Sequence, residues 1–306
     1  MYDIIIIGGG PAGLTAAIYG RRAGMSVLIL EITICGGQII NSTSVENFPS
    51  VPGIEGWRLA DNWQKQATAL GAEIRIASVD AIELHGKTKI VHTPKGDFEG
   101  KTVIIATGAG HRKLTCPGAA EFSGRGVSTC ATCDGAFFRG KPVAVVGGGN
   151  TALEDALYLS TICEKVYIVN RRNELRAERQ LVEAARAKEN VEFLTPYLPA
   201  EIIGDDLGRV AAMKVRHVET GEEVTLNVPG VFTAIGMVPD NARFANVCKL
   251  DESGYIIAGE DCETGTEGIY VAGDCRTKAL RQLITAAADG AVAATNAARL
   301  INTWRD

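Results

Sequence analysis

The chain has 306 residues, of which 46% are hydrophobic and 22% charged, with a formal net charge of −5 at pH 7. This length suggests about two domains, and the composition suits an α/β protein. The acidic balance leaves no electrostatic footprint for nucleic acid and disfavours an anionic membrane surface as a partner.

The first predicted element is a buried strand over residues 3–7, because the apolar run Ile4–Ile7 is short and leads directly into glycines. Such a run is too short for a transmembrane helix or a signal-peptide core. A glycine turn over Gly8–Gly13, a helix over residues 14–23 and a strand over Val27–Leu30 follow. Together these elements predict a βαβ unit.

The turn of this unit, Gly8-Gly9-Gly10-Pro11-Ala12-Gly13, has the spacing of a dinucleotide-binding fingerprint. Its first glycine permits the tight turn, the second lets the backbone approach a pyrophosphate, and the third lets helix pack on strand. The helix N-terminus adds N–H donors and positive potential. Glu31, at the end of the next strand, can accept hydrogen bonds from both ribose hydroxyls and would repel a 2′-phosphate. We therefore expect an unphosphorylated adenine dinucleotide here; a glycine turn without a ligand is the alternative.

The same plan recurs later in the chain. A strand over Pro142–Val146, a turn over Gly147–Ala152, a helix over Leu153–Cys163 and a strand over Val166–Val169 repeat the first unit imperfectly. This internal duplication predicts a second nucleotide site, in which Gly147, Gly149, Asn150 and Thr151 form the turn and Ala152 takes the last small position.

Arginines, not an acid, follow the second strand of this copy. Asn170-Arg171-Arg172 stands at the ribose end, with Arg176 slightly farther on. Guanidinium groups can bind a 2′-phosphate through paired, charge-assisted hydrogen bonds, so this site favours NADPH over NADH. The alternative is a solvated basic helix start, since Glu174 and Glu178 interleave with the arginines.

Three further apolar segments complete the predicted organisation. Thr102–Gly108 predicts a strand ending in a tight glycine turn, and Phe232–Gly236 repeats that shape. We interpret these two segments as the crossings between domains. Gly268–Asp274 predicts another buried strand, and a small-residue helix follows from about Leu283 to Arg299. This tail is expected to return and complete the first domain.

Between the two nucleotide units stands Cys130-Ala131-Thr132-Cys133-Asp134. Two thiols at this spacing can close a small disulfide ring, and Asp134 is a possible proton source for the thiolate that leaves when a disulfide is reduced. The alternatives are a pair of buried thiols or half of a metal site. With four histidines and no second Cys-x-x-Cys, we predict no metal. The other six cysteines, scattered without a framework spacing, indicate reduced thiols and a cytoplasmic protein.

In order and spacing, these motifs resemble low-molecular-weight, bacterial-type thioredoxin reductases, which are homodimeric, FAD-dependent members of the pyridine nucleotide-disulfide oxidoreductases. The resemblance covers essentially the whole chain. It rests on Gly8–Gly13, Gly36-Gly37-Gln38, Val45–Pro49, Ala106-Thr107-Gly108, Cys130–Asp134, Gly147–Ala152, Arg171-Arg172, Gly273-Asp274 and Arg281-Gln282.

The resemblance implies two Rossmann-like, three-layer ββα domains in an α/β fold. FAD is assigned to residues 1–113 and 241–306, and NADPH to residues 114–240, a domain inserted into the first that carries the dithiol. Asp274 is expected to bind the linking region of FAD, and Arg281 and Gln282 to lie against the flavin ring, while Glu154 matches an acidic residue near the nicotinamide. The remaining residues assigned to FAD by the resemblance are Gly37, Gln38, Asn47, Ala106 and Gly108.

The implied electron route runs from NADPH to FAD, then to the Cys130–Cys133 disulfide, and finally by dithiol exchange to thioredoxin. By the same resemblance, Cys133 lies on the flavin side, Cys130 attacks the partner, and Asp134 donates a proton. Nicotinamide and disulfide both belong to the inserted domain and must each approach the flavin. The family is therefore expected to rotate this domain between half-reactions.

Two positions depart from the family pattern. Asn170 replaces a histidine that commonly precedes the two arginines, and Leu175 stands where phenylalanine is frequent. An NADH- or ferredoxin-fed relative, a dithiol oxidase and a flavin-bound redox sensor without turnover remain alternatives. The intact arginines favour an NADPH-fed reductase over a ferredoxin-fed one.

Overall fold

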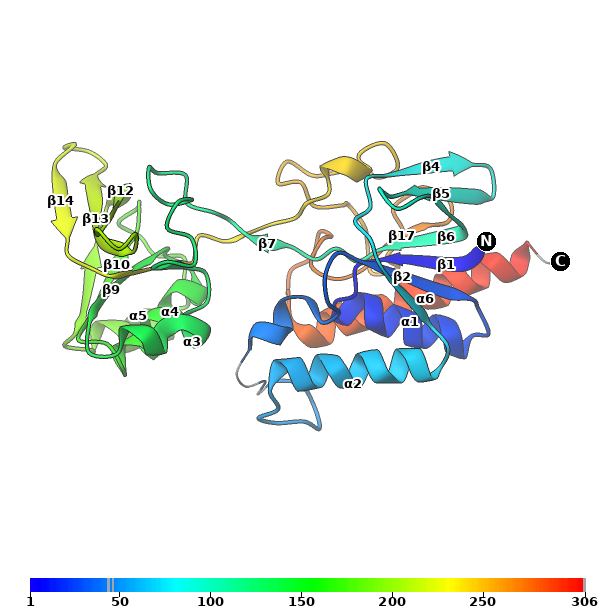
Figure 1. Ribbon diagram of the computed structural model, residues 1–306, viewed down its shortest axis with the longest axis horizontal. Helices are drawn as coiled ribbons and strands as arrows, with labels where there is room; N and C mark the ends of the chain where they lie inside the picture. The colour runs from blue at the N-terminus through cyan, green and yellow to red at the C-terminus, as the bar shows by residue number, and fades with distance from the viewer. Residues whose placement is uncertain (43–44, 46, 305–306) are drawn as a thin grey trace. The chain divides into compact units, whose positions relative to one another are not determined.

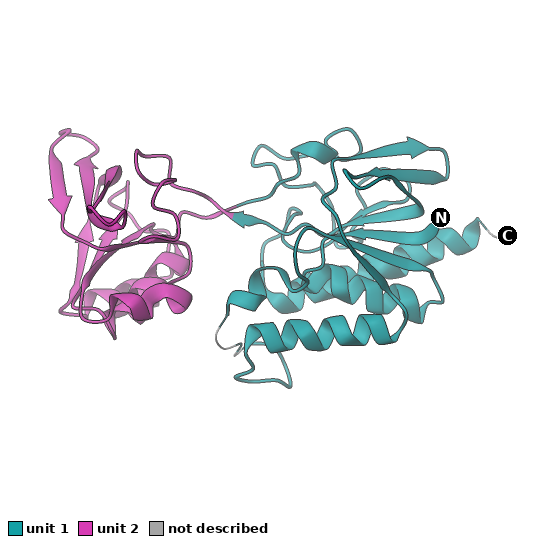
Figure 2. Cartoon of the chain, viewed as in Figure 1, with its two compact units in different colours: residues 1–110, 238–306 teal, residues 111–237 magenta. Residues whose placement is uncertain are grey.

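The computed structural model describes residues 1–42, 45 and 47–304, so Glu46 of the Val45–Pro49 motif lies outside the described residues. The chain divides into two compact units (Figure 2). The first unit comprises residues 1–110 and 238–306, and the second, residues 111–237, is inserted into it. The connecting segments β7 (Gly110–His111) and β16 (Met237–Val238) pair as a two-stranded sheet.

A seven-stranded sheet forms the centre of the first unit (Figure 1). Its order is β3-β2-β1-β6-β5-β4, and β17 also pairs with β6. The pairs among β1, β2, β3, β6 and β17 are parallel, whereas β4 and β5 join as an antiparallel extension. The strands are β1 (Tyr2–Ile7), β2 (Val27–Glu31), β3 (Glu73–Ile76), β4 (Ala81–His85), β5 (Thr88–His92), β6 (Phe98–Ile105) and β17 (Ile269–Val271).

Both faces of this sheet are covered, which explains why Ile4–Ile7 is apolar at every position. Ile4 and Ile6 pack with residues of α1 (Pro11–Arg22) and α6 (Leu283–Thr303). Ile5 and Ile7 pack on the opposite face, in the cluster that contains Phe244. Figure 1 shows α1, α6 and α2 (Gly56–Ala69) on one side of the sheet.

The second unit has three layers. Its parallel sheet has the order β11-β10-β9-β15-β8, and an antiparallel sheet has the order β12-β13-β14. Val143 and Val145 pack with residues of the helices, while Ala144 and Val146 pack with residues of the antiparallel sheet. The elements are β8 (Val127–Ser128), β9 (Pro142–Val146), β10 (Lys165–Val169), β11 (Val191–Leu194), β12 (Tyr197–Gly204), β13 (Val210–His217), β14 (Glu223–Leu226), β15 (Gly230–Thr233), α3 (Ala131–Asp134), α4 (Asn150–Ser160) and α5 (Arg179–Arg186).

Both fingerprint helices begin earlier than the sequence predicted. α1 begins at Pro11 and α4 at Asn150, inside their glycine turns. Proline suits the first helical position because its missing N–H would have no partner there. The short 3₁₀ helices are η1 (Gly37–Asn41), η2 (Gly135–Phe138) and η3 (Ala242–Phe244). Across the described part of the chain, every helix is too short or too polar to cross a membrane.

Candidate functional site

Of the three fingerprint glycines in the first turn, Gly8 and Gly13 are tightly packed and Gly10 is open. A Cβ on Gly8 would meet the Ala106 carbonyl oxygen at 2.3 Å, and Gly8 has a φ of 108° that favours glycine. A Cβ on Gly13 would meet the Gly8 carbonyl oxygen at 1.9 Å. For Gly10 the nearest atom is the Cα of Gly37, at 3.9 Å. Gly8 and Gly13 therefore pack closely against backbone carbonyls. Gly10, the glycine expected to approach a pyrophosphate, has free space beside it.

Glu31 lies against this turn. Its Oε2 accepts a hydrogen bond from the Gly9 N–H at 2.6 Å, and its Oε1 accepts one from the Ile32 N–H at 2.7 Å. Oε1 also accepts a hydrogen bond from the Thr33 N–H at 3.2 Å. Two carboxylate oxygens have about four lone-pair sites, so Oε2 can still accept from a ribose hydroxyl. Nearby, burial and then the Glu31 carboxylate raise the pKa of Cys35 to about 11, which keeps this thiol protonated near neutral pH.

Asp274 carries a buried carboxylate oxygen without a partner. Its Oδ1 is buried and has no hydrogen-bond partner among the described residues. Burial raises the pKa of this group, although the charges of Lys278 and Arg281 oppose the shift. An unpaired buried acceptor costs free energy, and such atoms commonly mark a place where a ligand or water completes the bonding. The position therefore fits a residue that binds a polar ligand.

Hydrogen bonds and a ring contact connect several of the predicted FAD residues to segments that are distant in the sequence. The Asn47 Nδ2 donates to the Gln282 Oε1 at 2.8 Å, and the Gln38 Nε2 donates to the Ala109 carbonyl at 3.3 Å. Gln282 caps the N-terminus of α6. The Arg281 guanidinium lies 4.1 Å from the ring centroid of Tyr255.

The second unit contains a cavity of about 580 Å³ beside its glycine turn. Gly147 has a φ of 148°, and a Cβ there would meet the Ala234 carbonyl oxygen at 2.2 Å. Around Gly149 no atom lies within 4 Å of a Cβ position, and Ala152 is completely buried. The two turns therefore share one design, tight at the first and last positions and open at the middle glycine. The cavity lining includes Gly147, Gly148, Gly149, Thr151, Arg171, Arg172, Arg176, Cys116, Thr115, Tyr197 and Leu198.

Arg171, Arg172 and Arg176 give this cavity a positive wall. All three side chains are exposed, and within the described residues none of them forms an ion pair. The interleaved Glu178 is instead bound by the Asn150 side chain, whose Nδ2 donates to its Oε1 at 2.9 Å. Unpaired guanidinium groups around a cavity fit a phosphate.

The structure does not place every predicted nucleotide residue in this wall. Thr151 lines the cavity, whereas the Asn150 side chain forms hydrogen bonds with Glu178. Glu154 is exposed on α4 and does not line the cavity.

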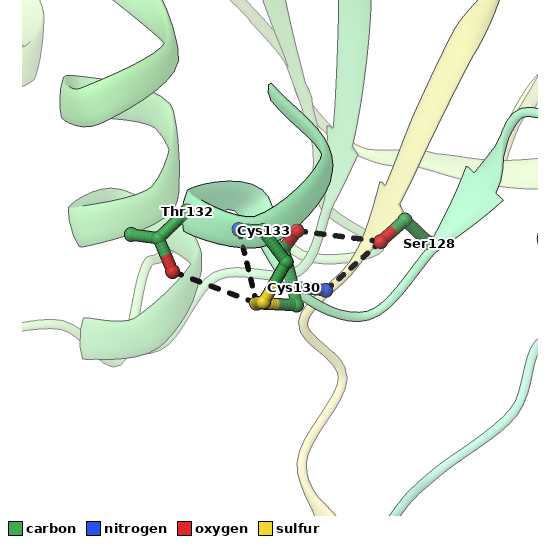
Figure 3. The surroundings of a disulfide bond; sticks show 4 residues. All are labelled: Ser128, Cys130, Thr132 and Cys133. Carbon is green, nitrogen blue, oxygen red and sulfur yellow. Dashed lines mark hydrogen bonds between the residues drawn. A yellow bond between two sulfur atoms is a disulfide. The ribbon is translucent and has the colours of Figure 1, made fainter. Parts of the chain in front are cut away.

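Cys130 and Cys133 form a disulfide with a Cα–Cα distance of 5.4 Å (Figure 3). Cys130 is the N-cap of α3, and its Sγ accepts a hydrogen bond from the Cys133 N–H at 3.2 Å. The Ser128 Oγ accepts from the Cys130 N–H at 3.0 Å, and the Thr132 Oγ1 lies 3.5 Å from the Cys130 Sγ. Both cysteines are half-buried, so a partner can reach the disulfide.

Sequence reasoning missed the supporting roles of Ser128 and Thr132. Ser128 precedes the motif and Thr132 stands inside it, and a hydroxyl two residues from a cysteine was the available signal. The half-buried Asp134 ends α3, and its N–H donates to the Cys130 carbonyl at 3.2 Å. The other six cysteines are free thiols.

Two glycine-turn units, the second of which carries a disulfide, define a nucleotide-dependent disulfide oxidoreductase. Residues 2–290 match the family described as Pyridine nucleotide-disulphide oxidoreductase. The thioredoxin reductase of Listeria innocua is 41% identical over 306 residues, covering 100% of this chain and 96% of the relative. That of Bacillus subtilis is 43% identical over 294 residues, covering 96% and 93%. The crystal structure of Lactococcus lactis thioredoxin reductase matches with a TM-score of 0.90 at 40% identity, covering 99% of this chain and 100% of that one.

The chain therefore belongs to the thioredoxin reductase family. Membership confirms the predicted fold class of two Rossmann-type domains. It also confirms the predicted cofactor pair, because this family uses FAD and NADPH.

Proposed function

We propose that the protein is a thioredoxin-disulfide reductase that passes electrons from NADPH through FAD and the Cys130–Cys133 disulfide to oxidised thioredoxin. The half-buried disulfide carries this proposal, because it lies in the same compact unit as a cavity walled by three exposed arginines. When bound, NADPH supplies a hydride and FAD carries the two electrons toward the disulfide.

The first unit would hold FAD. The N-terminus of α1, reached over the open face of Gly10, suits the pyrophosphate. The Glu31 carboxylate would accept from a ribose hydroxyl, and the unpartnered Asp274 oxygen would gain a donor from the linking region. Residues 1–113 and 241–306 form this proposed FAD domain. Its other proposed contacts are Gly8, Ala12, Gly13, Gly37, Gln38, Asn47, Ala106, Gly108, Arg281 and Gln282.

The second unit, proposed as residues 114–240, would hold NADPH. Gly149 leaves room for the pyrophosphate at the N-terminus of α4. Arg171, Arg172 and Arg176 would bind the 2′-phosphate. The proposed set also includes Gly147, Asn150, Thr151 and Glu154.

The dithiol chemistry follows from the surroundings of Cys130. Reduction of the disulfide takes two electrons and breaks the S–S bond, and Asp134, which directly follows Cys133, would supply the proton that the leaving thiolate needs. The Cys133 N–H stabilises a thiolate at Cys130, to whose sulfur it already donates.

In the second half-reaction, the Cys130 thiolate attacks the disulfide of thioredoxin and forms a mixed disulfide, releasing one partner thiolate. Cys133 then attacks the Cys130 sulfur, which restores the Cys130–Cys133 bond and releases thioredoxin as a dithiol. The inserted unit rotates about its two connections between the half-reactions. We propose a cytoplasmic homodimer, and the six free thiols support a reducing compartment.

Anaerobic stopped-flow absorbance tests this function. The purified flavoprotein is mixed with NADPH and then with oxidised thioredoxin, with NADH and reduced ferredoxin as parallel donors. We expect fast bleaching with NADPH, followed by reoxidation that requires thioredoxin. If only NADH or only reduced ferredoxin bleached the flavin, that donor and not NADPH would be the electron source. Bleaching by NADPH that thioredoxin does not reverse would leave the donor right and the partner wrong. No bleaching with any of the three donors would indicate a dithiol oxidase, whose flavin takes electrons from a dithiol, and binding of both cofactors without turnover would indicate a sensor.

A further inference from the structure

The segment that carries the three cavity arginines has no regular secondary structure, yet one side chain ties it together. From Arg171 to Glu178 the backbone forms neither helix nor strand. The Asn170 Nδ2 donates to the Arg172 carbonyl at 2.6 Å and to the Glu174 carbonyl at 3.3 Å. A single amide group therefore fixes the backbone on both sides of Asn173.

The same segment is fastened to the glycine turn. The Arg176 N–H donates to the Gly148 carbonyl at 2.7 Å. A Cβ on Gly148 would meet the Asn170 Oδ1 at 2.6 Å, so the asparagine side chain lies directly against the backbone of the turn. Farther along, the Glu178 N–H donates to the Asn150 Oδ1 at 2.8 Å, and the Asn150 Nδ2 returns a bond to Glu178.

This arrangement bears on phosphate recognition because the arginine side chains are exposed and long. A site that orders its backbone only on binding loses affinity to conformational entropy, whereas a site fixed beforehand does not. Bidentate hydrogen bonding from a guanidinium depends on the direction of the side chain and so on the backbone that bears it. The hydrogen bonds of the Asn170 amide fix this backbone, a role that a helix or a strand would otherwise have.

We infer that Asn170 is a positioning residue that sets the preference of the cavity for a 2′-phosphate. It acts through the backbone carbonyls of Arg172 and Glu174, and it holds the arginines in place next to the turn. This inference rests on the proposed NADPH role of the cavity and adds the residue that determines selectivity within it.

The test measures binding without turnover. Isothermal titration calorimetry on the oxidised, flavin-loaded protein compares adenosine 2′,5′-bisphosphate with adenosine 5′-monophosphate. In Asn170→Ala we expect the Kd of the bisphosphate to rise about tenfold, the equivalent of roughly 1.4 kcal/mol. The Kd of the monophosphate should change by less than about threefold. The two lost hydrogen bonds position the arginines that bind the 2′-phosphate, and the monophosphate has none.

Asn190→Ala is the matched control. The Asn190 Nδ2 also bridges two backbone carbonyls of the second unit, those of Ser160 at 2.9 Å and Cys163 at 3.2 Å, but Asn190 does not line the cavity. Both ligands should bind this variant as they bind the wild type. Asn170→Leu, which has a branched side chain of similar shape but cannot donate and carries no charge, provides a second measurement should Asn170→Ala fail to fold.

Equal loss of both ligands in Asn170→Ala, or an unchanged ratio of the two Kd values in both Asn170 variants, would overturn the inference. Failure of the proposed function looks different. In that case the wild-type protein itself would bind the bisphosphate no more tightly than the monophosphate.

Discussion

Arg276 donates two hydrogen bonds to Asp289, from Nε to Oδ2 at 2.9 Å and from Nη2 to Oδ1 at 2.8 Å. The two side chains are only 3% and 8% exposed. Lys278 and the Gly273 N–H also donate to Oδ2, at 2.8 and 2.9 Å. One buried carboxylate thus fixes the turn that bears Asp274.

The first prediction concerns this buried network. Burial alone would raise the pKa of Asp289, but hydrogen bonds from Arg276, Lys278 and Gly273 outweigh it and lower the pKa. The stabilisation is therefore present above the ordinary aspartate pKa and is lost as pH falls through the lowered value. Asp289→Ala removes the carboxylate that Arg276 and Lys278 share and leaves Arg276 only the exposed Glu260, 3.7 Å away. We expect a loss of about 3–5 kcal/mol in denaturant unfolding at pH 7.

Glu223→Ala serves as its control. Glu223 accepts from Arg216 at 2.8 Å, but its side chain is 43% exposed. Removing this surface pair should cost less than about 1 kcal/mol. Equal losses in the two variants would contradict a special role for the buried network.

The second prediction concerns Asp155 on α4. Burial, reinforced by the Glu154 carboxylate, raises the pKa of Asp155 from 3.8 to about 7. The folded protein therefore binds this proton more tightly than the unfolded chain, so its stability is full below about pH 4 and falls as pH rises toward 7. Asp155→Asn should raise the free energy of unfolding at pH 8 on the order of 2 kcal/mol and change it little at pH 4. A gain of equal size at both pH values would disprove the titration.

The third prediction separates the two cysteines of the disulfide from the free thiols. In Cys133→Ser, the sulfur that must reattack Cys130 is gone, so thioredoxin reduction should fall more than about 1,000-fold. Binding of adenosine 2′,5′-bisphosphate should persist, because the cavity is intact. Cys163→Ala, which removes a buried free thiol of the same unit, should keep its activity. Full thioredoxin reduction by Cys133→Ser would refute the mechanism.

The fourth prediction concerns the positive wall of the cavity. The double variant Arg171→Ala and Arg172→Ala should raise the KM for NADPH about 10- to 100-fold with kcat nearly unchanged, and the KM for NADH should change little. Arg179→Ala is the control, because Arg179 pairs with Glu183 at 2.6 Å and does not line the cavity. Steady-state kinetics with both donors decides, and unchanged NADPH kinetics in the double variant would exclude the arginines from phosphate recognition.

The fifth prediction contrasts two glycines of one turn. Gly147→Ala forces a side chain into a left-handed backbone and against the Ala234 carbonyl, so we expect a loss of more than about 3 kcal/mol in stability. Gly149→Ala meets no atom within 4 Å and should alter stability by less than about 1 kcal/mol. Its methyl group would still occupy the space expected for the pyrophosphate, so calorimetry should show weaker NADP⁺ binding. Normal binding by Gly149→Ala would place the pyrophosphate elsewhere.

Local patterns in the sequence were enough to predict the strands of both βαβ units and both glycine turns, but not the short parallel strands Glu73–Ile76 and Val191–Leu194. Ile4–Ile7 and Pro142–Val146 are apolar at consecutive positions and precede glycines, which is a signal that buried parallel strands share. The first residues of the two fingerprint helices were harder to predict. Pro11 and Asn150 lie within the fingerprints, and the glycine turn and the first helical turn occupy the same residues.

Long-range pairing lay beyond sequence reasoning. The antiparallel strand Val210–His217 mixes charged and apolar residues, and its pairing with Tyr197–Gly204 has irregular register. Asp289 sits among alanines in α6, where an acid ordinarily faces solvent, and its partner Arg276 stands in a loop that precedes the helix. Only the folded arrangement of the two segments shows that the charges meet.

The pairing of β17 with β6, and the packing of α6 on α1, also constrain the order in which the chain acquires structure during synthesis. Residues 111–237 leave the ribosome as an uninterrupted stretch, and every strand of their two sheets is present once Thr233 has emerged. The first unit at that moment still lacks β17 and α6. The apolar side chains of Ile104 and Leu14 are therefore not yet covered by the α6 residues with which they share a core cluster. Because domains generally fold as units, we expect the inserted unit to fold first. Residues 1–110 can complete their fold only after residues 238–306 have been translated.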